Sequence, residues 1–289
     1  MTNDLSGIGI WSSQLRYGDQ ADAADAAGEL ESLGYSALWV PDVGGDLFGV
    51  LENLLGATAR ATIATGILNL WMHTPAEAAA AFDRLTRTFG RRLFVGIGVS
   101  HAPLVDRKQP GRYQRPLQQM VEYLDGLDAA DPPLPAAARC LAALGPKMLE
   151  LAKARTAGTH PYLVTPEHTA TARDRLGAGP LVAPEQAVVL ETDPAAARAI
   201  ARQHLATYIG LPNYFRNWER VGLTEQDRAD GGSDRLVDAL VAWGDEDAIA
   251  ARVAAHRAAG AEHVCIQVLT DEPQRFPRDE WRQLAPALV

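Results

Sequence analysis

The sequence predicts an α/β fold, a (β/α)8 barrel, and three observations lead to this prediction. Short apolar runs alternate with helical patterns from one end of the 289 residues to the other. Each run is continuous, without regular polar interruptions, which is typical of parallel strands that are buried on both faces. Eight runs, each followed by a helix, give the count that a barrel requires, and such a domain usually takes roughly 250 residues.

The eight apolar runs are the expected strands. In order they are Gly7–Trp11, Ala37–Val40, Ile63–Leu68, Leu93–Gly98, Arg139–Ala143, Gly158–Leu163, Gln186–Leu190 and His263–Leu269. Several helices between them are expected to begin with proline at the first helical position, where its missing N–H costs nothing. These starts are Thr74-Pro75, Gly145-Pro146, Thr165-Pro166 and Asp193-Pro194, and Glu77 adds a capping box to the first of them.

Glycines predict where two other helices end. The helix Asp19–Leu33 is expected to end before Gly34, and the helix Asp245–Ala259 before Gly260. Glycine suits this position because it adopts the left-handed conformation without strain. A final helix near Asp279–Leu288 is expected to be the eighth of the barrel.

The regular spacing is interrupted once, between the seventh and eighth expected strands. We expect the segment Thr192–Ala261 to be a helical insertion that includes the helices Pro212–Arg220 and Asp234–Trp243. An insertion of this kind often covers the mouth of a barrel. No linker or low-complexity tract interrupts the chain, so residues 1–289 are expected to form one domain.

A doubly wound sheet is the alternative α/β fold, and it requires a glycine-rich turn after its first strand. The chain reads Ser-Ser-Gln-Leu-Arg-Tyr after Gly7–Trp11, with no such turn. Gly96-Ile97-Gly98-Val99-Ser100-His101 begins like a dinucleotide fingerprint and lacks its third glycine. These departures favour the barrel.

Charge and composition limit the partners. The net charge of −9 and the pI near 5.3 argue against nucleic acid, which requires a basic face. No apolar run approaches the ~20 residues of a membrane span, and the first residues lack the pattern of a signal peptide. We expect a cytoplasmic protein. Cys140 and Cys265 are expected to be free thiols, with a disulfide as the alternative, and no metal site is expected.

In a barrel the active site lies at the carboxyl ends of the strands. The segments there are rich in Gly, Trp, Asn, Ser and His and poor in strong acids and bases, which suits a large planar cofactor. A Schiff-base aldolase would need a strand lysine, and Lys108, Lys147 and Lys153 lie outside the strands. The first strand has no histidine for a zinc hydrolase. A glycosidase could use Asp42 and Glu191, but aromatic residues for a sugar are sparse.

Six segments, in order along the chain, carry a family resemblance. They are Trp39–Asp42, Thr65–Pro75, Arg92–Val99, Tyr113–Pro116, Leu144–Ala152 and Ala157–Tyr162. Together they resemble the luciferase-like monooxygenase family, and most closely its short branch of coenzyme F420-dependent oxidoreductases. The resemblance implies an enzyme that transfers a hydride between the deazaflavin coenzyme F420 and a small organic substrate. An FMN-dependent monooxygenase and a non-catalytic binding or scaffolding subunit stay open. Family members are often dimers, so a homodimer is an open expectation.

The resemblance also implies site residues. A non-prolyl cis peptide is expected at Gly66–Ile67, in a bulge of the third strand behind the cofactor ring, with a plain trans strand as the alternative. Asp42 matches the acidic residue after the second strand, although it could simply cap a loop. Many hydride-transferring relatives have a histidine next, where this chain has Val43. That departure puts a sugar-phosphate dehydrogenase in doubt.

The remaining candidates surround the expected ring. The catalytic candidates are Asp42 and His160; the cofactor-binding candidates are Asp42, Gly66, Ile67, Asn69, Gly98, Ser100, His101, Gly145, Pro146, His160 and Tyr162. Backbone N–H groups of Gly98, Ser100 and Gly145, with the helix start at Pro146, would hold the cofactor phosphate. An apolar pocket is expected from Trp11, Trp39 and Trp71. For His73, His101 and His160 a core imidazole stays open. Glu185 is expected in a solvated loop, with a carboxylate that lines a strand as the alternative.

One loop is basic in this acidic chain. Between His101 and Arg115 it contains Arg107, Lys108, Arg112 and Arg115 against the single acid Asp106. Such a loop suits the anionic phosphate and glutamyl tail of coenzyme F420. A solvated loop without a ligand is the alternative.

Overall fold

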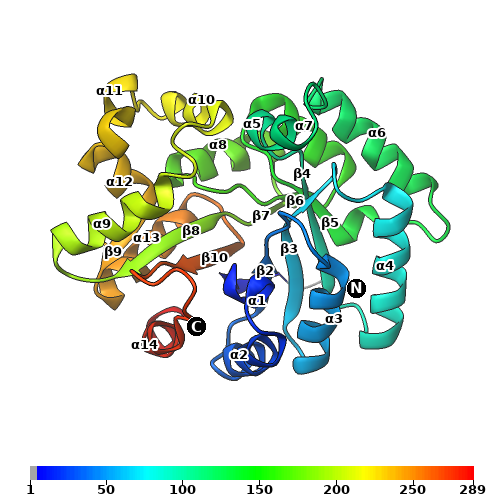
Figure 1. Ribbon diagram of the computed structural model, residues 1–289, viewed down its shortest axis with the longest axis horizontal. Coiled ribbons are helices and arrows are strands. Elements are labelled where there is room, and N and C mark those ends of the chain that lie inside the picture. Colours follow the sequence, from blue (N-terminus) through cyan, green and yellow to red (C-terminus); the bar gives the residue numbers. More distant parts are fainter. Residues whose placement is uncertain (1–4) are drawn as a thin grey trace.

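The computed structural model describes residues 5–289, without the side chain of Lys108. Ten parallel strands form one curled sheet, and helices cover its outer face (Figure 1). The strands are β1 (Gly7–Trp11), β2 (Ala37–Val40), β3 (Thr62–Asn69), β4 (Leu93–Gly98), β5 (Arg139–Leu141), β6 (Gly158–Thr159), β7 (Leu181–Val182), β8 (Glu185–Leu190), β9 (Val241–Gly244) and β10 (His263–Val268).

Helices connect the strands in a β–α order, as the sequence predicts. They are α1 (Gln14–Tyr17), α2 (Gln20–Ser32), α3 (Leu47–Ala57), α4 (Pro75–Phe89), α5 (Ala102–Lys108), α6 (Pro116–Ala129), α7 (Pro146–Arg155), α8 (Pro166–Leu176), α9 (Pro194–Leu205), α10 (Pro212–Arg220), α11 (Glu225–Arg228), α12 (Asp234–Leu240), α13 (Glu246–Ala258) and α14 (Arg278–Leu288), with 3-10 turns at Ala136–Ala138 and Ala229–Gly231. The capping box of Thr74 and Glu77 is present, and Gly34 and Gly260 have φ of 99° and 100°.

The sheet closes on itself through one segment. Strands β7 and β8, far apart in the order β7-β6-β5-β4-β3-β2-β1-β10-β8-β9, are consecutive pieces of Leu181–Leu190. Ala183 N donates to Thr159 O at 2.9 Å, which joins the first piece to β6. Cys265 N donates to Pro184 O at 3.0 Å, which joins the segment to β10. The carboxyl ends of the strands therefore meet at one rim.

The sixth strand is shorter than expected. Only Gly158–Thr159 pairs in the sheet, and the prediction of a strand to Leu163 is wrong. Pro161 has no N–H to donate to a ladder, and Leu163 has a positive φ of 51°, which turns the chain away. The fifth strand likewise ends at Leu141, two residues before its expected end.

The segment between β8 and β10 is not purely helical, so that prediction is wrong in part. Helix α12 ends at Leu240, and Val241–Gly244 is a strand, whereas the sequence predicts a helix to Trp243. Because β6 leaves the sheet early, β8 has a free edge. Strand β9 pairs with that edge in the register Ala187↔Val241 and satisfies its backbone groups.

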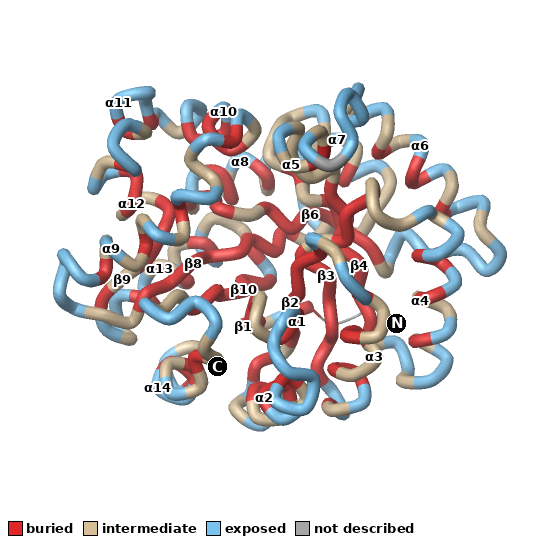
Figure 2. The backbone as a smooth tube through the Cα atoms, viewed as in Figure 1, coloured by how far each residue is buried: buried red, intermediate tan, exposed pale blue. Residues whose placement is uncertain are grey.

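Apolar side chains fill both the inside and the outside of the sheet, and the buried parts of the chain follow the strands (Figure 2). Inside the barrel, Trp39, Phe94, Cys140 and Cys265 belong to one buried cluster. Both cysteines are free thiols, as predicted. Trp39 is fully buried there, so it does not line an open pocket. Among the described residues, no helix has the length and apolarity of a membrane span.

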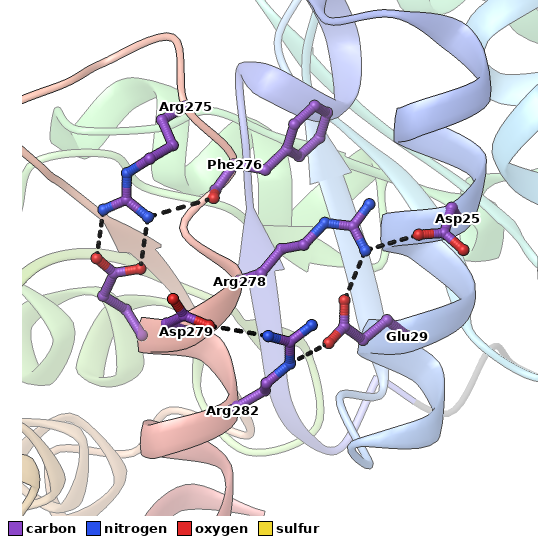
Figure 3. Close-up of polar contacts among 8 residues, drawn as sticks. Asp25, Glu29, Arg275, Phe276, Arg278, Asp279 and Arg282 are labelled. Carbon is purple, nitrogen blue, oxygen red and sulfur yellow. Dashed lines mark hydrogen bonds and ion pairs between the residues drawn. The ribbon is translucent and has the colours of Figure 1, made fainter.

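Ion pairs tie the last helix to α2 (Figure 3). Arg278 contacts Asp25 and Glu29 at 2.7 Å each, and Arg282 Nε donates to Glu29 at 2.5 Å. Each surface pair contributes little by itself, but Glu29 is shared by both arginines. This network holds α14 against the first βα unit.

Candidate active site at the carboxyl rim

The bulge of β3 lies at the centre of the rim. The register of β3 with β4 shifts between Thr65 and Leu68, and the Gly66–Ile67 peptide is cis. The predicted bulge and cis peptide are therefore confirmed. Ile67 is the single partly exposed residue in an otherwise buried strand.

Two glycines make the bulge possible. A Cβ on Gly66 would lie 2.7 Å from Trp11 Nε1 and 2.9 Å from His160 Nε2. Trp11 Nε1 also donates to Gly66 O at 2.8 Å. A Cβ on Gly98 would lie 2.6 Å from Ile67 Cδ1. Trp11 and His160 therefore support the bulge from below, and Gly98 leaves room for the Ile67 side chain.

Asp42 is buried beside the bulge and holds the end of β3. Its Oδ2 accepts hydrogen bonds from Asn69 N at 3.1 Å and from His73 Nε2 at 3.0 Å. Its Oδ1 has no partner within the described part of the chain. Val43, which replaces the histidine of many relatives, is 62% exposed. An imidazole still stands next to Asp42, because the loop after β3 supplies His73.

His160 lies under the bulge in the barrel core. Its ring stacks on Trp39 at 4.1 Å between centroids, and Nδ1 lies 2.7 Å from Ala183 O. Burial lowers the pKa of His160 to about 4, so the imidazole is neutral at pH 7 and Nδ1 donates. Its Nε2 has no partner in the described structure and points towards Gly66.

Tyr162 stands at the rim between the barrel and α9. Its hydroxyl donates to Gln267 Oε1 at 2.8 Å and lies 3.2 Å from Tyr208 Oη and 3.4 Å from His204 Nε2. Its ring lies 5.3 Å from that of Trp11. Burial raises the pKa of Tyr162 well above its ordinary value, so the phenol stays protonated. Sequence reasoning missed Tyr208 and His204, which come from the helical segment after β8.

The loop after β4 meets α10. Ser100 has a positive φ of 55°, and its carbonyl accepts a 3.4 Å hydrogen bond from Tyr113 Oη. The His101 ring lies 4.8 Å from that of Tyr214 on α10. Burial lowers the pKa of His101 to about 4, so this imidazole is also neutral at pH 7.

Glu185 is fully buried, and its expected place in a solvated loop is wrong. It begins β8, and its Oε2 accepts a hydrogen bond from Leu163 N at 3.1 Å. Its Oε1 has no partner among residues 5–289. Burial raises the pKa of Glu185 to about 8, so the carboxyl is mostly protonated at pH 7. A strand that is buried on both faces places any residue at this position inside the protein.

The remaining candidates lie on both sides of the bulge. Gly145 precedes α7 and Pro146 is its first residue, as expected. On the other side, Arg112 and Arg115 of the basic loop line a cavity of about 510 Å3 together with Trp71. Arg112 lies over the Trp71 ring at 5.8 Å and donates to Trp71 O at 3.1 Å. Residues 5–289 contain no cluster of three or more potential metal ligands.

Comparisons with known proteins agree with the fold. Residues 6–131 match the family model of the luciferase-like monooxygenases. A protein of Mycobacterium tuberculosis that is assigned to the coenzyme F420-dependent oxidoreductases is 26% identical over 119 residues. That match covers 41% of this chain and only 33% of the relative, about a third of its length.

Solved structures share the fold over the whole chain. An F420-dependent secondary alcohol dehydrogenase superposes with a TM-score of 0.76 at 16% identity, covering 98% of this chain and 99% of the other. The coenzyme F420-dependent tetrahydromethanopterin reductase of Methanopyrus kandleri superposes with a TM-score of 0.76 at 17% identity, covering 98% of each chain. A Baeyer–Villiger monooxygenase of Pseudomonas putida in complex with FMN superposes with a TM-score of 0.67 at 14% identity, covering 98% of this chain and 99% of the other.

The fold and the bulged third strand define a luciferase-like α/β barrel. The match of residues 6–131 to the luciferase-like family model and the partial match to the Mycobacterium tuberculosis protein agree with the resemblance seen in the sequence. The resemblance that the sequence predicts is therefore confirmed for residues 6–131. The same matches support the prediction that the protein is an enzyme of this family.

Proposed function

We propose that the protein is an oxidoreductase that transfers a hydride between coenzyme F420 and a small organic substrate. The observation that carries this proposal is the bulge of β3, where Ile67 is the one partly exposed residue of the strand. A flat ring requires an apolar platform without protruding side chains, and Ile67 between Gly66 and Gly98 offers one. When bound, the deazaflavin supplies the redox chemistry that protein side chains lack.

Several polar groups around the platform lack partners, which supports a ligand there. Asp42 Oδ1 and His101 Nδ1 are buried without a hydrogen bond among the described residues. Unpaired buried groups are rare in proteins, because each costs free energy. We assign Asp42, Gly66, Ile67, Asn69 and His101 to the ring and its ribityl chain. The phosphate would be bound by Gly98, Ser100, Gly145 and Pro146. Tyr162 would form the substrate side, whereas His160 lies below the bulge.

Transfer of a hydride to or from a carbonyl carbon requires a proton at the substrate oxygen. The Asp42–His73 pair could hold this proton, because the carboxylate orients the imidazole through a 3.0 Å contact. Asp42 and His160 were the catalytic candidates from the sequence. His160 is neutral and buried below the bulge, so in this proposal it positions the platform and His73 joins Asp42.

An FMN-dependent monooxygenase is the second candidate. It is supported by the FMN complex of the Pseudomonas putida monooxygenase, whose chain superposes over 98% of this one. Both cofactors have a planar tricyclic ring and a phosphate, so the platform alone does not distinguish them. The basic loop favours coenzyme F420, whose glutamyl tail FMN lacks.

A pair of titrations tests the assignment. The purified protein is titrated with coenzyme F420, followed by its fluorescence, and separately with FMN. We expect saturable binding of coenzyme F420 that is at least tenfold tighter than that of FMN, a difference of about 1.4 kcal/mol. Tighter binding of FMN would replace the deazaflavin assignment with the monooxygenase. Binding of neither would favour the non-catalytic subunit.

We also propose that residues 1–289 form one domain and that the protein is a cytoplasmic homodimer. The first part is supported by the closure of the sheet between β1 and β10, which joins the two ends of the chain. The second rests on the family resemblance alone.

A further inference from the structure

Arg16 is a buried cation at the rim that the proposed function does not use. It lies in α1, the short helix that follows β1, and is only 5% exposed. Its Nη2 donates to Gly44 O at 2.7 Å, and its Nε is buried without a partner in the described part of the chain. No carboxylate among residues 5–289 forms an ion pair with it. The guanidinium therefore keeps donors and a full charge for a further partner.

A buried guanidinium without a counter-charge is unusual. Arginine stays protonated in proteins, so it cannot avoid the cost of burial by losing its charge. Buried charges are therefore normally paired with an opposite charge. Arg16 has only the face of the Tyr17 ring, which lies 4.8 Å from its guanidinium carbon, and one backbone carbonyl. An anionic ligand would supply the missing counter-charge.

The loop after β2 bends around the guanidinium. Gly44 and Gly45 have φ of 127° and 79°, which glycine adopts without strain. A Cβ on Gly45 would lie 3.6 Å from Arg16 Nη2, so the backbone passes close to the charged group. Val43 before this turn is 62% exposed. The turn therefore places a carbonyl against the guanidinium and fixes its orientation.

The same loop connects Arg16 to the proposed proton site. Gly44 follows Asp42 by two residues, and Asp42 Oδ2 contacts His73. Tyr17 Oη accepts a hydrogen bond from Val43 N at 2.9 Å. Burial raises the pKa of Tyr17, and the charges of Arg16 and Asp42 act on this phenol in opposite directions, so both lie near it. An anion on Arg16 would thus be held beside the Asp42–His73 pair.

The charges around Arg16 fit a carboxylate better than a phosphate. Arg16 is the one basic residue in the two loops that meet here, residues 12–18 and 41–46. The second loop carries Asp42 and Asp46, which would repel a dianion. A single guanidinium balances the single charge of a carboxylate, and its planar fork matches the two carboxylate oxygens.

From these observations we propose that Arg16 binds the carboxylate of the substrate, so that the substrate is a small organic acid. The inference rests on the proposed function for the role of this anion as the substrate. The anion site itself depends only on the surroundings of Arg16. Gly44 O holds the guanidinium in place, and Nε is free to donate to the carboxylate.

Thermal unfolding with small acids tests the proposal. Acetate, pyruvate and benzoate are added to the protein, with and without coenzyme F420, and each acid is compared with its neutral amide. Sodium chloride keeps the ionic strength constant. One or more of the acids should raise the Tm of wild type with increasing concentration, because a ligand of the folded state stabilises it, and the amides should not. Arg16→Gln should need at least about tenfold more acid for the same rise, the loss of a charge-assisted hydrogen bond.

Three further variants separate binding from loop structure and from general charge. Arg16→Lys keeps the charge but loses the fork, so its response should be intermediate. Tyr17→Phe removes the acceptor for Val43 N and keeps the ring under the guanidinium, so it should respond like wild type. Arg91→Gln removes an exposed charge before β4, at the amino ends of the strands, and should also respond like wild type.

Each outcome decides a point. The proposal is overturned if no acid raises the Tm of wild type more than its amide does, or if Arg16→Gln responds like wild type. A loss in Tyr17→Phe as large as that in Arg16→Gln would also overturn it, because Arg16 would then act only through the shape of the loop. If Arg16→Gln does not fold, Arg16→Lys carries the comparison. If wild type does not bind coenzyme F420, the proposed function fails, and the response of the cofactor-free protein still decides the anion site.

Discussion

At the scale of single residues, Gly98 shows how closely the platform is packed. A methyl group there would lie 2.6 Å from Ile67 Cδ1 and 3.4 Å from Ala142 Cβ. We expect Gly98→Ala to lower the free energy of unfolding by about 1–3 kcal/mol, because overpacking forces neighbouring side chains to move. Urea unfolding followed by circular dichroism measures this change.

Gly210→Ala is the control for that variant. No atom lies within 4 Å of the place that a Cβ on Gly210 would take, and its φ is not positive, so a methyl group there meets nothing. Its unfolding free energy should stay near that of wild type. Equal stability of both variants would contradict the packing of Ile67 against Gly98.

Glu185 predicts a pH dependence of stability. Its pKa is raised to about 8 in the folded protein by burial, from an ordinary value of 4.5. Between these values the folded state binds the proton and the unfolded state releases it, so stability falls as the pH rises. The loss is about 1.4 kcal/mol for each pH unit within this window. Glu185→Gln, which keeps an acceptor for Leu163 N, should remove this contribution.

Chemical unfolding at pH 6 and pH 8 measures the effect as a difference between proteins. Wild type should lose more stability over this interval than Glu185→Gln. Glu219→Gln, at an exposed position on α10, should behave like wild type. Parallel pH profiles for wild type and Glu185→Gln would show that the buried carboxyl does not titrate in this range.

Individual site residues could be predicted from sequence only as far as their position along a strand. The end of β2 places Asp42 at the rim, but the partner His73 follows 31 residues later in the loop after β3. Only the neighbouring position of β2 and β3 brings the two together. The burial of Glu185 was missed because the start of a short strand and a loop have similar composition.

At the scale of elements, the basic loop before α6 is proposed to bind the anionic tail of the cofactor. Arg112 and Arg115 line the 510 Å3 cavity beside Trp71. We expect the double variant Arg112→Gln and Arg115→Gln to weaken the binding of coenzyme F420 by about 0.4–2 kcal/mol, since each exposed charge contributes about 0.2–1 kcal/mol. Titration at low and at high salt measures it, and the loss should shrink with salt.

Arg107→Gln is the matched control for the loop. Arg107 is exposed on α5 and does not line the cavity, so its removal should cost little. The riboside of the deazaflavin lacks the phosphate and the glutamyl residues. Its affinity should be the same for wild type, the double variant and Arg107→Gln. An unchanged affinity of the double variant for coenzyme F420 at low salt would exclude a role of this loop in binding.

Among the elements, the helix starts were predicted closely, whereas the short β6 and the additional β9 were not. Helix starts depend on local signals such as Thr74 with Glu77, which act within four residues. Strand β9 depends instead on an edge that becomes free only because β6 ends after two residues. Val241 and Trp243 have no local signal that separates the end of a helix from such a strand. Local patterns do not contain that information.

At the scale of the whole molecule, the barrel could be predicted because its periodicity follows from burial. Runs such as Leu93–Gly98 are apolar on both faces, which only a covered parallel sheet requires. Closure through the shared segment Leu181–Leu190 was not predicted, since β7 and β8 lie far apart in the sheet order but follow each other directly in sequence.

The pairing of β1 with β10 also has a consequence for synthesis of the protein. Gly7 pairs with His263, so the ring of strands cannot close until nearly the whole chain has left the ribosome. Until then β1 exposes a free edge, and such edges pair readily with other chains. Nascent chains fold from the N-terminus at about 5–20 residues per second. At that rate the stretch from Gly7 to His263 takes some tens of seconds to synthesise, and we expect the edge of β1 to stay unpaired on one side during this time.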